Sequence, residues 1–443
     1  MSLPRVLVYG QPFNRSHGGG ITLSNLFTGW DKKSIAVAAM GHLMYNITTD
    51  ICNNYYQLGN EEFRWKFPFY LLQRRFSSGV LDVKESKSSP LSPTKSGLRS
   101  LLVNRVFYPA LEWIGVFHSA KVLKMSERFQ KWLSDFQPEV LYMQVSTRET
   151  VLFATALTDY LNIPSVIHFM DDWPSTLSSM GLLKSHWRKR IDRELKVLLD
   201  KVDVHLSISE AMAAEYRTRY NKMFSPFHNP IVISKYLSKP KIRVINGVFR
   251  ILYLGRIGTA NMVSIKSFSF TISKLEFKEI KVTLDVYTPD SNTAGSLALA
   301  KLRNVSIQPP IANELVPDLL TEFDLLLLPL DFAEKGLKYA RFSIPTKLSE
   351  YMISGTPILV YSPKESAVSI FCQMHECALC VNDESEDALA EAILFLISNA
   401  EYREKISENA VRVATDLFDA DVVRPRFHDM LSRLASSKSP VPE

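Results

Sequence analysis

One short segment of the sequence carries side chains suited to binding a diphosphate. The run from Arg341 to Pro357, RFSIPTKLSEYMISGTP, places Ser343, Thr346 and Lys347 around Pro345. Because proline is favoured in the first turn of a helix, the hydroxyls, the ammonium and the free backbone N–H groups of that turn should converge. The alternative is an ordinary capped helix with an exposed Lys–Glu pair.

Two further residue groups extend this candidate site. Glu350 follows Lys347 by three residues, on a neighbouring face of the predicted helix, where a carboxylate could accept two ribose hydroxyls. Gly355 is typical of a residue that ends a helix. Gly255 and Arg256 follow another predicted strand, at the sheet edge where ligands of α/β proteins bind. An arginine there suits a phosphate, although a plain surface arginine remains an alternative.

A glycine cluster near the N-terminus is the next candidate. The chain has only 17 glycines in 443 residues, and three of them are consecutive, Gly18, Gly19 and Gly20. They follow a predicted strand and precede a helix expected to start near Ile21. Such a loop lets the backbone approach a phosphate or a sugar hydroxyl closely, and the alternative is a tight turn. Neither G-x-G-x-x-G nor the P-loop pattern occurs.

A histidine and two aspartates are the predicted catalytic residues. The run IHFMDDWP places His168, Asp171 and Asp172 at and after the end of a predicted strand. A histidine and a carboxylate there could orient a reacting hydroxyl or a sugar. The alternative is a structural histidine and a helix-capping aspartate.

The sequence FCQMHECALC holds potential metal ligands. Cys372, His375, Cys377 and Cys380 are conceivable zinc ligands, but residues 378–381 are a predicted strand and no second ligand cluster is close in sequence. We therefore expect buried free thiols and no metal site.

The elements that position these residues follow an α/β pattern. Short apolar runs alternate with helical patterns, which indicates parallel sheets covered on both faces. The predicted strands form two series, 6–9, 35–39, 140–145, 165–169 and 202–208, then 249–254, 282–287, 305–307, 324–328, 357–361 and 378–381. Two doubly wound, Rossmann-like domains facing across a cleft are the simplest architecture.

The predicted domain boundaries follow from this rhythm. Residues 1–235 form an N-terminal domain, 236–248 a linker, 249–420 a C-terminal domain and 421–443 a final helix with a tail. Residues 77–124 interrupt the first domain with a serine- and lysine-rich loop and a basic, aromatic helical insertion. That insertion is either a core-facing helix pair or a surface that contacts an anionic membrane.

Composition excludes several classes of protein. Hydrophobic residues make up 46% of the chain and the net charge is +6, which argues against a dedicated nucleic-acid binder. No run of 18 apolar residues without charges occurs, which argues against a spanning helix. Four cysteines and no recognisable signal peptide predict a reducing, cytoplasmic location.

Taken in order, the motifs resemble those of the GT-B glycosyltransferases, closest to the family 4-like group of retaining, nucleotide-sugar-dependent enzymes. The glycine-rich loop, the LGR at residues 254–256 and the S-x-P-T-K-x-x-E-Y-M-x-x-G-x-P run occur in the family's order. The resemblance implies the GT-B fold, a nucleotide-sugar-binding C-terminal domain and a final helix that returns to the N-terminal domain.

The resemblance also implies an activity. A sugar would pass from a nucleoside diphosphate sugar to a hydroxyl of a glycan or lipid-linked acceptor, as in polysaccharide biosynthesis, with retention and without a cofactor. Glu350 would bind the ribose, Arg256 and Lys347 the diphosphate, and His168 the transferred sugar. The chain departs from the family's E-x7-E motif at Phe342, which stands in place of the first glutamate. A noncatalytic GT-B scaffold or partner protein and a nucleotide-sugar 2-epimerase remain alternatives.

Overall fold

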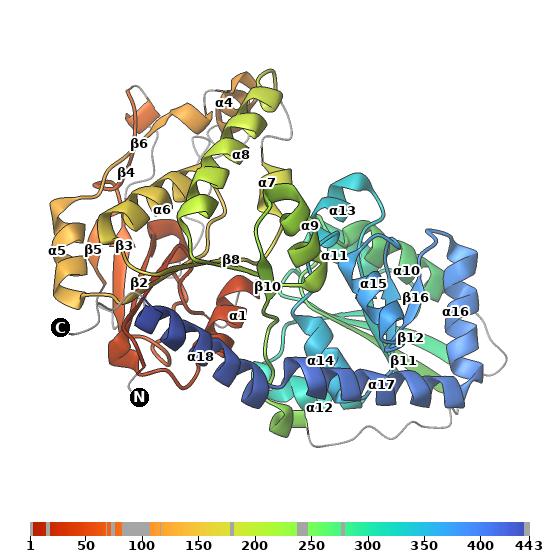
Figure 1. The fold of residues 1–443 in the computed structure, drawn as a ribbon. Helices are drawn as coiled ribbons and strands as arrows, with labels where there is room; N and C mark the ends of the chain where they lie inside the picture. Colours follow the sequence, from red (N-terminus) through yellow and green to blue (C-terminus); the bar gives the residue numbers. More distant parts are fainter. Residues whose placement is uncertain are drawn as a thin grey trace. The chain divides into compact units, whose positions relative to one another are not determined.

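A computed structural model gives the fold in two compact units (Figure 1). It describes residues 3–14, 18–67, 69–71, 76–81, 107–115, 117–177, 181–236, 247–275 and 280–437. Unit 1 comprises Met1–Phe227 and Arg424–Glu443, and unit 2 comprises His228–Val423. Most of the predicted linker 236–248 and most of the predicted loop in 77–124 lie outside the described residues.

Unit 1 is built on an eight-stranded sheet with the order β10-β9-β8-β7-β1-β2-β3-β5. All neighbours pair in parallel except β3 and β5, and β4 and β6 form a separate antiparallel pair. Its strands are β1 (Val6–Tyr9), β2 (Ile35–Met40), β3 (Asn54–Leu58), β4 (Phe63–Trp65), β5 (Gly79–Val80), β6 (Lys121–Leu123), β7 (Val140–Met143), β8 (Ser165–Phe169), β9 (Val204–Ser207) and β10 (Phe224–Pro226). Its helices are α1 (Gly18–Phe27), α4 (Tyr108–Ile114), α5 (Glu127–Phe136), α6 (Arg148–Leu161), α7 (Trp173–Thr176), α8 (Lys184–Lys201) and α9 (Glu210–Tyr220).

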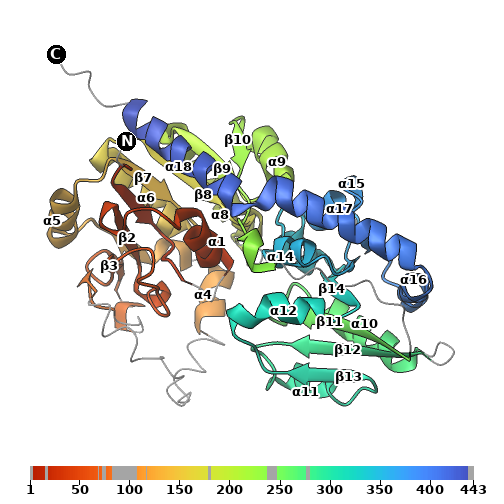
Figure 2. The ribbon, with the colours of Figure 1, turned by 90° about the horizontal axis from the view of Figure 1, so that it is seen from below.

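Unit 2 is built on a six-stranded, fully parallel sheet with the order β13-β12-β11-β14-β15-β16 (Figure 2). Its strands are β11 (Val248–Leu254), β12 (Lys281–Tyr287), β13 (Val305–Gln308), β14 (Leu325–Pro329), β15 (Ile358–Tyr361) and β16 (Leu379–Val381). Its helices are α10 (Met262–Lys274), α11 (Ala294–Leu299), α12 (Val316–Thr321), α13 (Glu334–Ala340), α14 (Lys347–Ser354), α15 (Ala367–Met374), α16 (Glu386–Ser398) and α17 (Ala400–Phe418). The last helix, α18 (Ala420–Ser437), begins in unit 2 and continues into unit 1.

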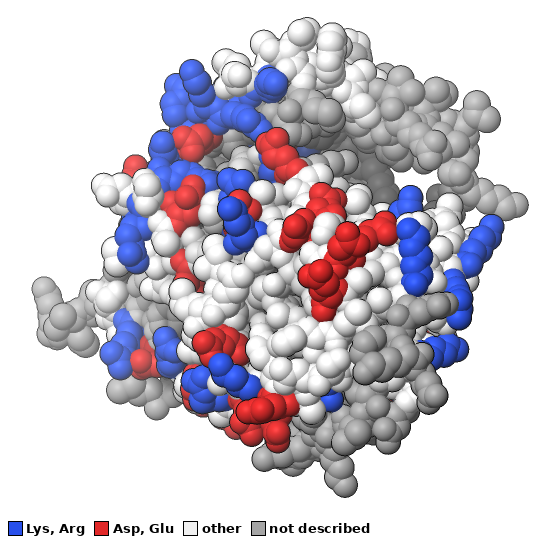
Figure 3. Space-filling view, turned by 90° about the vertical axis from the view of Figure 1, so that its right-hand side faces the viewer, with Lys and Arg blue, Asp and Glu red and all other residues white. Residues whose placement is uncertain are grey.

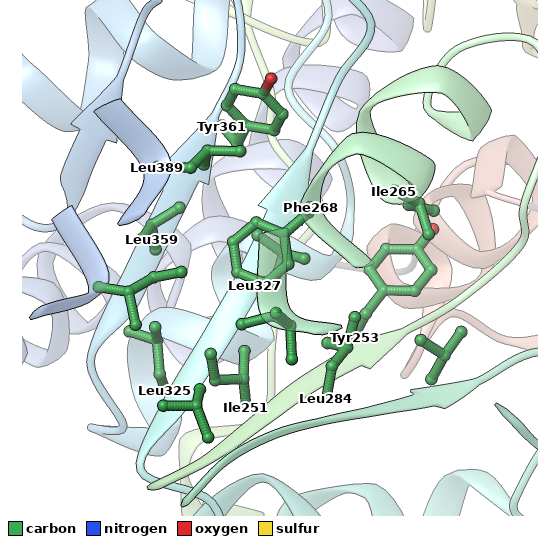
Figure 4. Close-up of a cluster of buried hydrophobic side chains, with 14 of the residues drawn as sticks. Ile251, Tyr253, Ile265, Phe268, Leu284, Leu325, Leu327, Leu359, Tyr361 and Leu389 are labelled. Atoms are coloured by element: carbon green, nitrogen blue, oxygen red, sulfur yellow. The ribbon is translucent and has the colours of Figure 1, made fainter. Parts of the chain in front are cut away.

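The predicted α/β class with two parallel sheets is confirmed, and the reason is visible in the burial of the strands. The central strands β1, β7, β14 and β15 are buried at every residue, because helices cover both faces of a doubly wound sheet. Figure 4 shows the core of unit 2, where side chains of the strands, among them Ile251 and Leu327, meet Phe268 of α10. Five described strands of unit 1 were not predicted: β3, β4, β5, β6 and β10.

Helix starts follow from short polar side chains. Ser126, Thr147, Ser209, Ser366 and Ser385 each accept a hydrogen bond from the backbone N–H three residues later, at the starts of α5, α6, α9, α15 and α16. Each such cap satisfies an N–H group that the helix itself cannot pair. Among the described residues, no helix is long and apolar enough to cross a membrane.

The final helix packs tightly against α1. The ring of Phe427 is fully buried and lies 5.1 Å from Phe27 and 5.9 Å from Tyr142, measured between ring centroids. Arg424 Nε donates to the carbonyl of Asn25 at 2.7 Å, and His428 Nε2 lies 2.9 Å from the carbonyl of Leu26. These contacts satisfy carbonyl groups at the end of α1, where a helix leaves its last acceptors unpaired.

We expect Phe427→Ala to lower the free energy of unfolding by about 3–5 kcal/mol, because a buried aromatic ring is replaced by a cavity. Val422→Ala in the same helix is the control, since Val422 is 46% exposed and its truncation should cost well under 1 kcal/mol. Urea unfolding followed by circular dichroism measures both. Equal loss in the two variants would contradict the packing described for α18.

Candidate functional site

The centre of the candidate site in unit 2 is the side chain of Lys347, the first residue of α14. Its ammonium lies against the Cα of Gly255, the residue after β11. A Cβ at position 255 would come within 2.2 Å of Lys347 Nζ, and Gly255 has a φ of +142°, which side-chain-bearing residues rarely adopt. The glycine therefore provides both the backbone turn and the space through which the lysine reaches the end of the strand.

The phenol of Tyr253 holds this arrangement together. Its Oη donates to the carbonyl of Arg256 at 2.5 Å and accepts from Asn261 Nδ2 at 2.7 Å and Lys347 Nζ at 3.3 Å. The ammonium also lies 4.4 Å from the centroid of the tyrosine ring, within the range of a cation–π interaction. Neither Tyr253 nor Asn261 was predicted, because a tyrosine in an apolar strand looks like an ordinary core residue.

Lys347 and Glu350 are half-buried, and desolvation shifts both of their pKa values. It lowers the pKa of Lys347 to about 8 and raises the pKa of Glu350 to about 7, while the attraction between the two groups opposes both shifts. Among the described residues, no carboxylate lies within 4.0 Å of Lys347 Nζ. The site therefore holds a cation that lacks full compensation, which an anionic ligand would stabilise.

The start of α14 adds hydrogen-bonding groups to this cation. Thr346 is the N-cap residue, and its side chain makes no capping bond. The helix begins at Lys347 and not at Pro345, whose carbonyl instead accepts the N–H of Leu348 at 3.0 Å. Ser343 Oγ is buried without a hydrogen-bond partner among the described residues. A helix N-terminus that carries an ammonium, with an unsatisfied hydroxyl four residues before it in sequence, has the groups that bind an anion.

Helix α14 is fastened to the strand that ends at the site. Tyr351 Oη accepts the backbone N–H of Leu254 at 3.1 Å, and Gly355 ends the helix in the left-handed conformation, with a φ of 71°. The predicted helix end at Gly355 is thus confirmed. Burial and the charge of Glu350 both raise the pKa of Tyr236, which places this phenol close to the carboxylate.

Arg256 is held differently from Lys347. Its side chain is 71% exposed and pairs with Asp290 at 3.2 Å, while Asp290 also accepts the N–H of Ile257 at 3.1 Å. The guanidinium holds the pKa of Asp290 below its usual value. The Arg256 end of this ion pair is thus open to solvent, whereas the Asp290 side chain is only 16% exposed. Asp290 was not predicted.

In unit 1, two of the predicted catalytic residues are bound to buried neighbours. His168 is 1% exposed, and its Nδ1 lies 2.6 Å from Tyr142 Oη. Asp172 is 3% exposed and accepts from Arg219 at 2.8 Å, from Tyr216 at 2.8 Å and from Ser175 at 2.6 Å. These contacts favour structural roles for both side chains.

The other candidates of unit 1 are arranged around α1 and α7. Asp171 is exposed, next to the start of α7. Gly18, Gly19 and Gly20 form the first turn of α1 and not a loop before it, so the expected start near Ile21 was three residues late. A Cβ at Gly20 would meet Asn14 Nδ2 at 2.0 Å, so close packing of α1 accounts for this glycine.

The predicted thiols carry no metal site in the described part of the chain. Cys372 and Cys377 are buried and free, and Cys380 is half-buried and free. The neighbouring thiols and burial raise the pKa of Cys372. Among the described residues, no group of three or more His, Cys, Asp or Glu side chains could hold a metal ion.

Comparisons with known proteins bear directly on unit 2. Residues 248–399, which contain the whole Lys347 site, match the family of glycosyl transferases group 1. This match identifies a glycosyl transferases group 1 domain within unit 2. The chain as a whole has the GT-B fold. No curated protein matches the chain significantly.

Solved structures share the fold of this chain over nearly its whole length. Anabaena HepE in complex with UDP and glucose has a TM-score of 0.59 at 12% identity, covering 97% of this chain and 100% of its own. Sucrose-phosphate synthase from Thermosynechococcus elongatus has a TM-score of 0.63 at 10% identity, covering 98% and 99%. A trehalose-6-phosphate structure from E. coli, bound with UDP-2-fluoro glucose, has a TM-score of 0.57 at 10% identity, covering 99% and 100%.

We expect Lys347 to titrate near pH 8, well below the ordinary lysine value of 10.5. Glu350→Gln should move the midpoint lower still, because the carboxylate raises the pKa of the ammonium. Reductive ¹³C-methylation and NMR titration measure this shift, and the signal missing from Lys347→Met identifies the residue. A Lys347 signal that titrates with the bulk of the lysines would contradict the desolvated site.

Proposed function

We propose that this chain is a glycosyltransferase, which uses a nucleoside diphosphate sugar as donor and transfers the sugar, with retention, to a hydroxyl of a glycan or lipid-linked acceptor. The observation that carries the donor assignment is the Lys347 ammonium held across Gly255 at the free end of α14. Positive groups placed where the leaving diphosphate gains charge are the main electrostatic contribution to such a reaction. The proposal needs no cofactor.

The diphosphate contacts are assigned to four groups of unit 2. Lys347 supplies a partly desolvated charge, and the N–H groups at Thr346 and Lys347 supply the positive end of the helix dipole. Ser343 Oγ supplies a hydroxyl that has no partner among the described residues. Arg256, whose side chain is 71% exposed, swings from Asp290 to the phosphate, and Asp290 keeps the hydrogen bond from the N–H of Ile257.

The ribose contact is assigned to Glu350. Its carboxylate lies three residues along α14 from Lys347, and it accepts two neighbouring hydroxyls when ionised. The pKa of Glu350, about 7, means that ribose binding is favoured as the pH rises through neutrality. Phe342 leaves this chain without the first carboxylate of the E-x7-E motif, so contacts to the transferred sugar must come from other residues.

The acceptor side is assigned to unit 1, with Asp171 as the exposed carboxylate. His168 and Asp172 then act as positioning residues, since both are buried against other side chains. The first turn of α1, with Gly18, Gly19 and Gly20, offers backbone N–H groups to a donor or acceptor oxygen. A lipid-linked acceptor requires contact with a membrane surface, which is the second part of the proposal.

The fold neighbours support a uridine nucleotide as the first donor to test. HepE was solved with UDP and glucose, and the E. coli structure with UDP-2-fluoro glucose. We expect one member of a panel of nucleoside diphosphate sugars to be consumed in the presence of a hydroxyl acceptor, and NMR of the product to show the anomeric configuration of the donor. Donor epimerised without acceptor would indicate the 2-epimerase, and donor bound without turnover on any acceptor the noncatalytic scaffold.

Gly255→Ala tests the geometry of the diphosphate site. The new methyl group displaces the ammonium, so we expect UDP affinity measured by calorimetry to fall about 10- to 100-fold, the contribution of one hydrogen bond to a charged group. Gly258→Ala is the control, because a Cβ there meets no atom within 4 Å. Unchanged UDP affinity in Gly255→Ala, with both variants folded, would contradict the assignment.

The pH dependence of UDP binding tests Lys347 itself. Protonated Lys347 binds the diphosphate, so affinity should fall as the pH rises through about 8, where the free site loses its charge. The terminal phosphate, with a second pKa of about 6, stays ionised over this range. Lys347→Arg should keep its affinity to higher pH, because a guanidinium does not deprotonate. Parallel pH profiles of the two proteins would contradict a role for the lysine.

A further inference from the structure

A group of exposed apolar side chains lies where α4 ends and α8 begins, in unit 1. Trp113 is 55% exposed, Ile114 47%, Leu182 70% and Leu183 46%. The two segments are directly bonded, since the N–H of Leu182 donates to the carbonyl of Trp113 at 2.9 Å. We call these four residues the apolar tip. Neighbouring exposed large apolar side chains mark an interaction site more often than scattered ones do.

Buried contacts among α4, α6 and α8 fix the position of the apolar tip. Trp187 of α8 is 5% exposed and donates through Nε1 to the carbonyl of Gly115 at 2.6 Å. Gly115 has a φ of +83°, and a Cβ there would lie 2.7 Å from Leu183 Cβ, so the two segments pack closely. Arg148 of α6 pairs with Glu194 of α8 at 2.6 Å and lies 5.2 Å from the ring centroid of Trp187. Buried packing contacts therefore fix the backbone segments that carry the exposed side chains.

Helix α8 continues from the tip as a strongly basic element. It contains seven basic and three acidic residues, a net charge of +4 out of +6 for the whole chain. Glu194 forms ion pairs with Arg148 and Arg190, and Asp192 forms an ion pair with Lys196. Lys184, Arg188, Lys189 and Arg193 are exposed along the same helix. Figure 3 shows one face of the molecule, with Lys and Arg side chains gathered at its upper left.

The apolar tip and the basic residues of α8 together favour one class of binding partner. A nucleic acid would engage the basic residues but not exposed leucine, isoleucine and tryptophan side chains at their end. A second copy of this surface would bring two +4 helices together, which opposes self-association. An anionic bilayer accepts both features, because lysine and arginine bind its phosphates while leucine and tryptophan enter the boundary between headgroups and acyl chains.

We propose that the apolar tip and the basic face of α8 dock unit 1 on an anionic lipid bilayer. This inference specifies the membrane contact of the proposed function and is independent of the donor chemistry. It also extends the membrane contact predicted for the helical insertion within residues 77–124, of which α4 supplies Trp113 and Ile114, to a surface shared with α8. The bilayer is the partner, and a lipid-linked acceptor is the reason for the contact.

The test is co-sedimentation of the full chain with vesicles of phosphatidylcholine containing phosphatidylserine. Each basic residue near an anionic surface contributes about fivefold to partitioning, so Arg188→Gln/Lys189→Gln/Arg193→Gln should lower it about a hundredfold. Lys266→Gln/Lys281→Gln/Lys301→Gln is the matched control, since it removes three exposed charges from unit 2. Equal binding by the two triple variants would overturn the proposal, as would equal binding of the parent to phosphatidylcholine alone.

A second measurement locates the tip. Phosphatidylcholine with brominated acyl chains, mixed with phosphatidylserine, should quench tryptophan fluorescence in the parent and much less in Trp113→Phe. Leu182→Ser should lower partitioning about tenfold, because a largely exposed leucine loses its burial in lipid. Quenching that is unchanged in Trp113→Phe would overturn the tip assignment, and so would self-association through the tip in sedimentation velocity without vesicle binding.

The UDP affinity of every variant separates this proposal from the donor site. UDP binding retained while vesicle binding is lost supports both assignments. UDP binding absent from the parent while vesicle binding behaves as expected would reject the donor site and leave the membrane surface standing.

Discussion

The site of unit 2 depends on one constraint: the ammonium of Lys347 is partly desolvated, and its hydrogen-bond partner is the phenol of Tyr253. A carboxylate does not occupy that place. Tyr253 Oη holds Lys347 Nζ at 3.3 Å and the ring faces the charge at 4.4 Å. A carboxylate partner would have satisfied the ammonium and raised its pKa. A phenol orients the ammonium and leaves most of its charge for a ligand, so the site is organised before any anion arrives.

Several features of the fold follow from this requirement. The ammonium can cross the end of β11 only because residue 255 has no side chain, and the hydrogen bond from the N–H of Leu254 to Tyr351 Oη joins α14 to the same strand. Tyr253 belongs to the buried core of unit 2 through its ring and to the site through its hydroxyl. The packing of the sheet therefore sets the position of the charge, which would not be true of a lysine on a surface loop.

The sequence predicted the strands and helix ends of the molecule better than the contacts of its polar side chains. Strand 6–9 and the helix end at Gly355 were predicted where the structure has them, because continuous apolar runs and an isolated glycine are local signals. Tyr253 was missed because its ring packs in the core like that of any apolar strand residue. Only its hydroxyl, at the end of β11, belongs to the site. Asp172 was predicted as a catalytic residue, whereas in the structure it pairs with Arg219. Because Arg219 lies 47 residues further along the sequence, no local sequence pattern predicts that pairing.

The proposed donor site and the proposed membrane surface would use positive charge in two physically different ways. At Lys347 a single cation gains its effect from desolvation, so one displaced ammonium removes most of the binding contribution and dissolved salt screens it little. On α8 many exposed cations each contribute a small amount, so the effect is additive and strongly screened by salt. This contrast explains why the modest total of +6 is compatible with both roles. A buried site needs one well-placed charge, whereas a surface needs a local excess, and α8 alone carries a net +4.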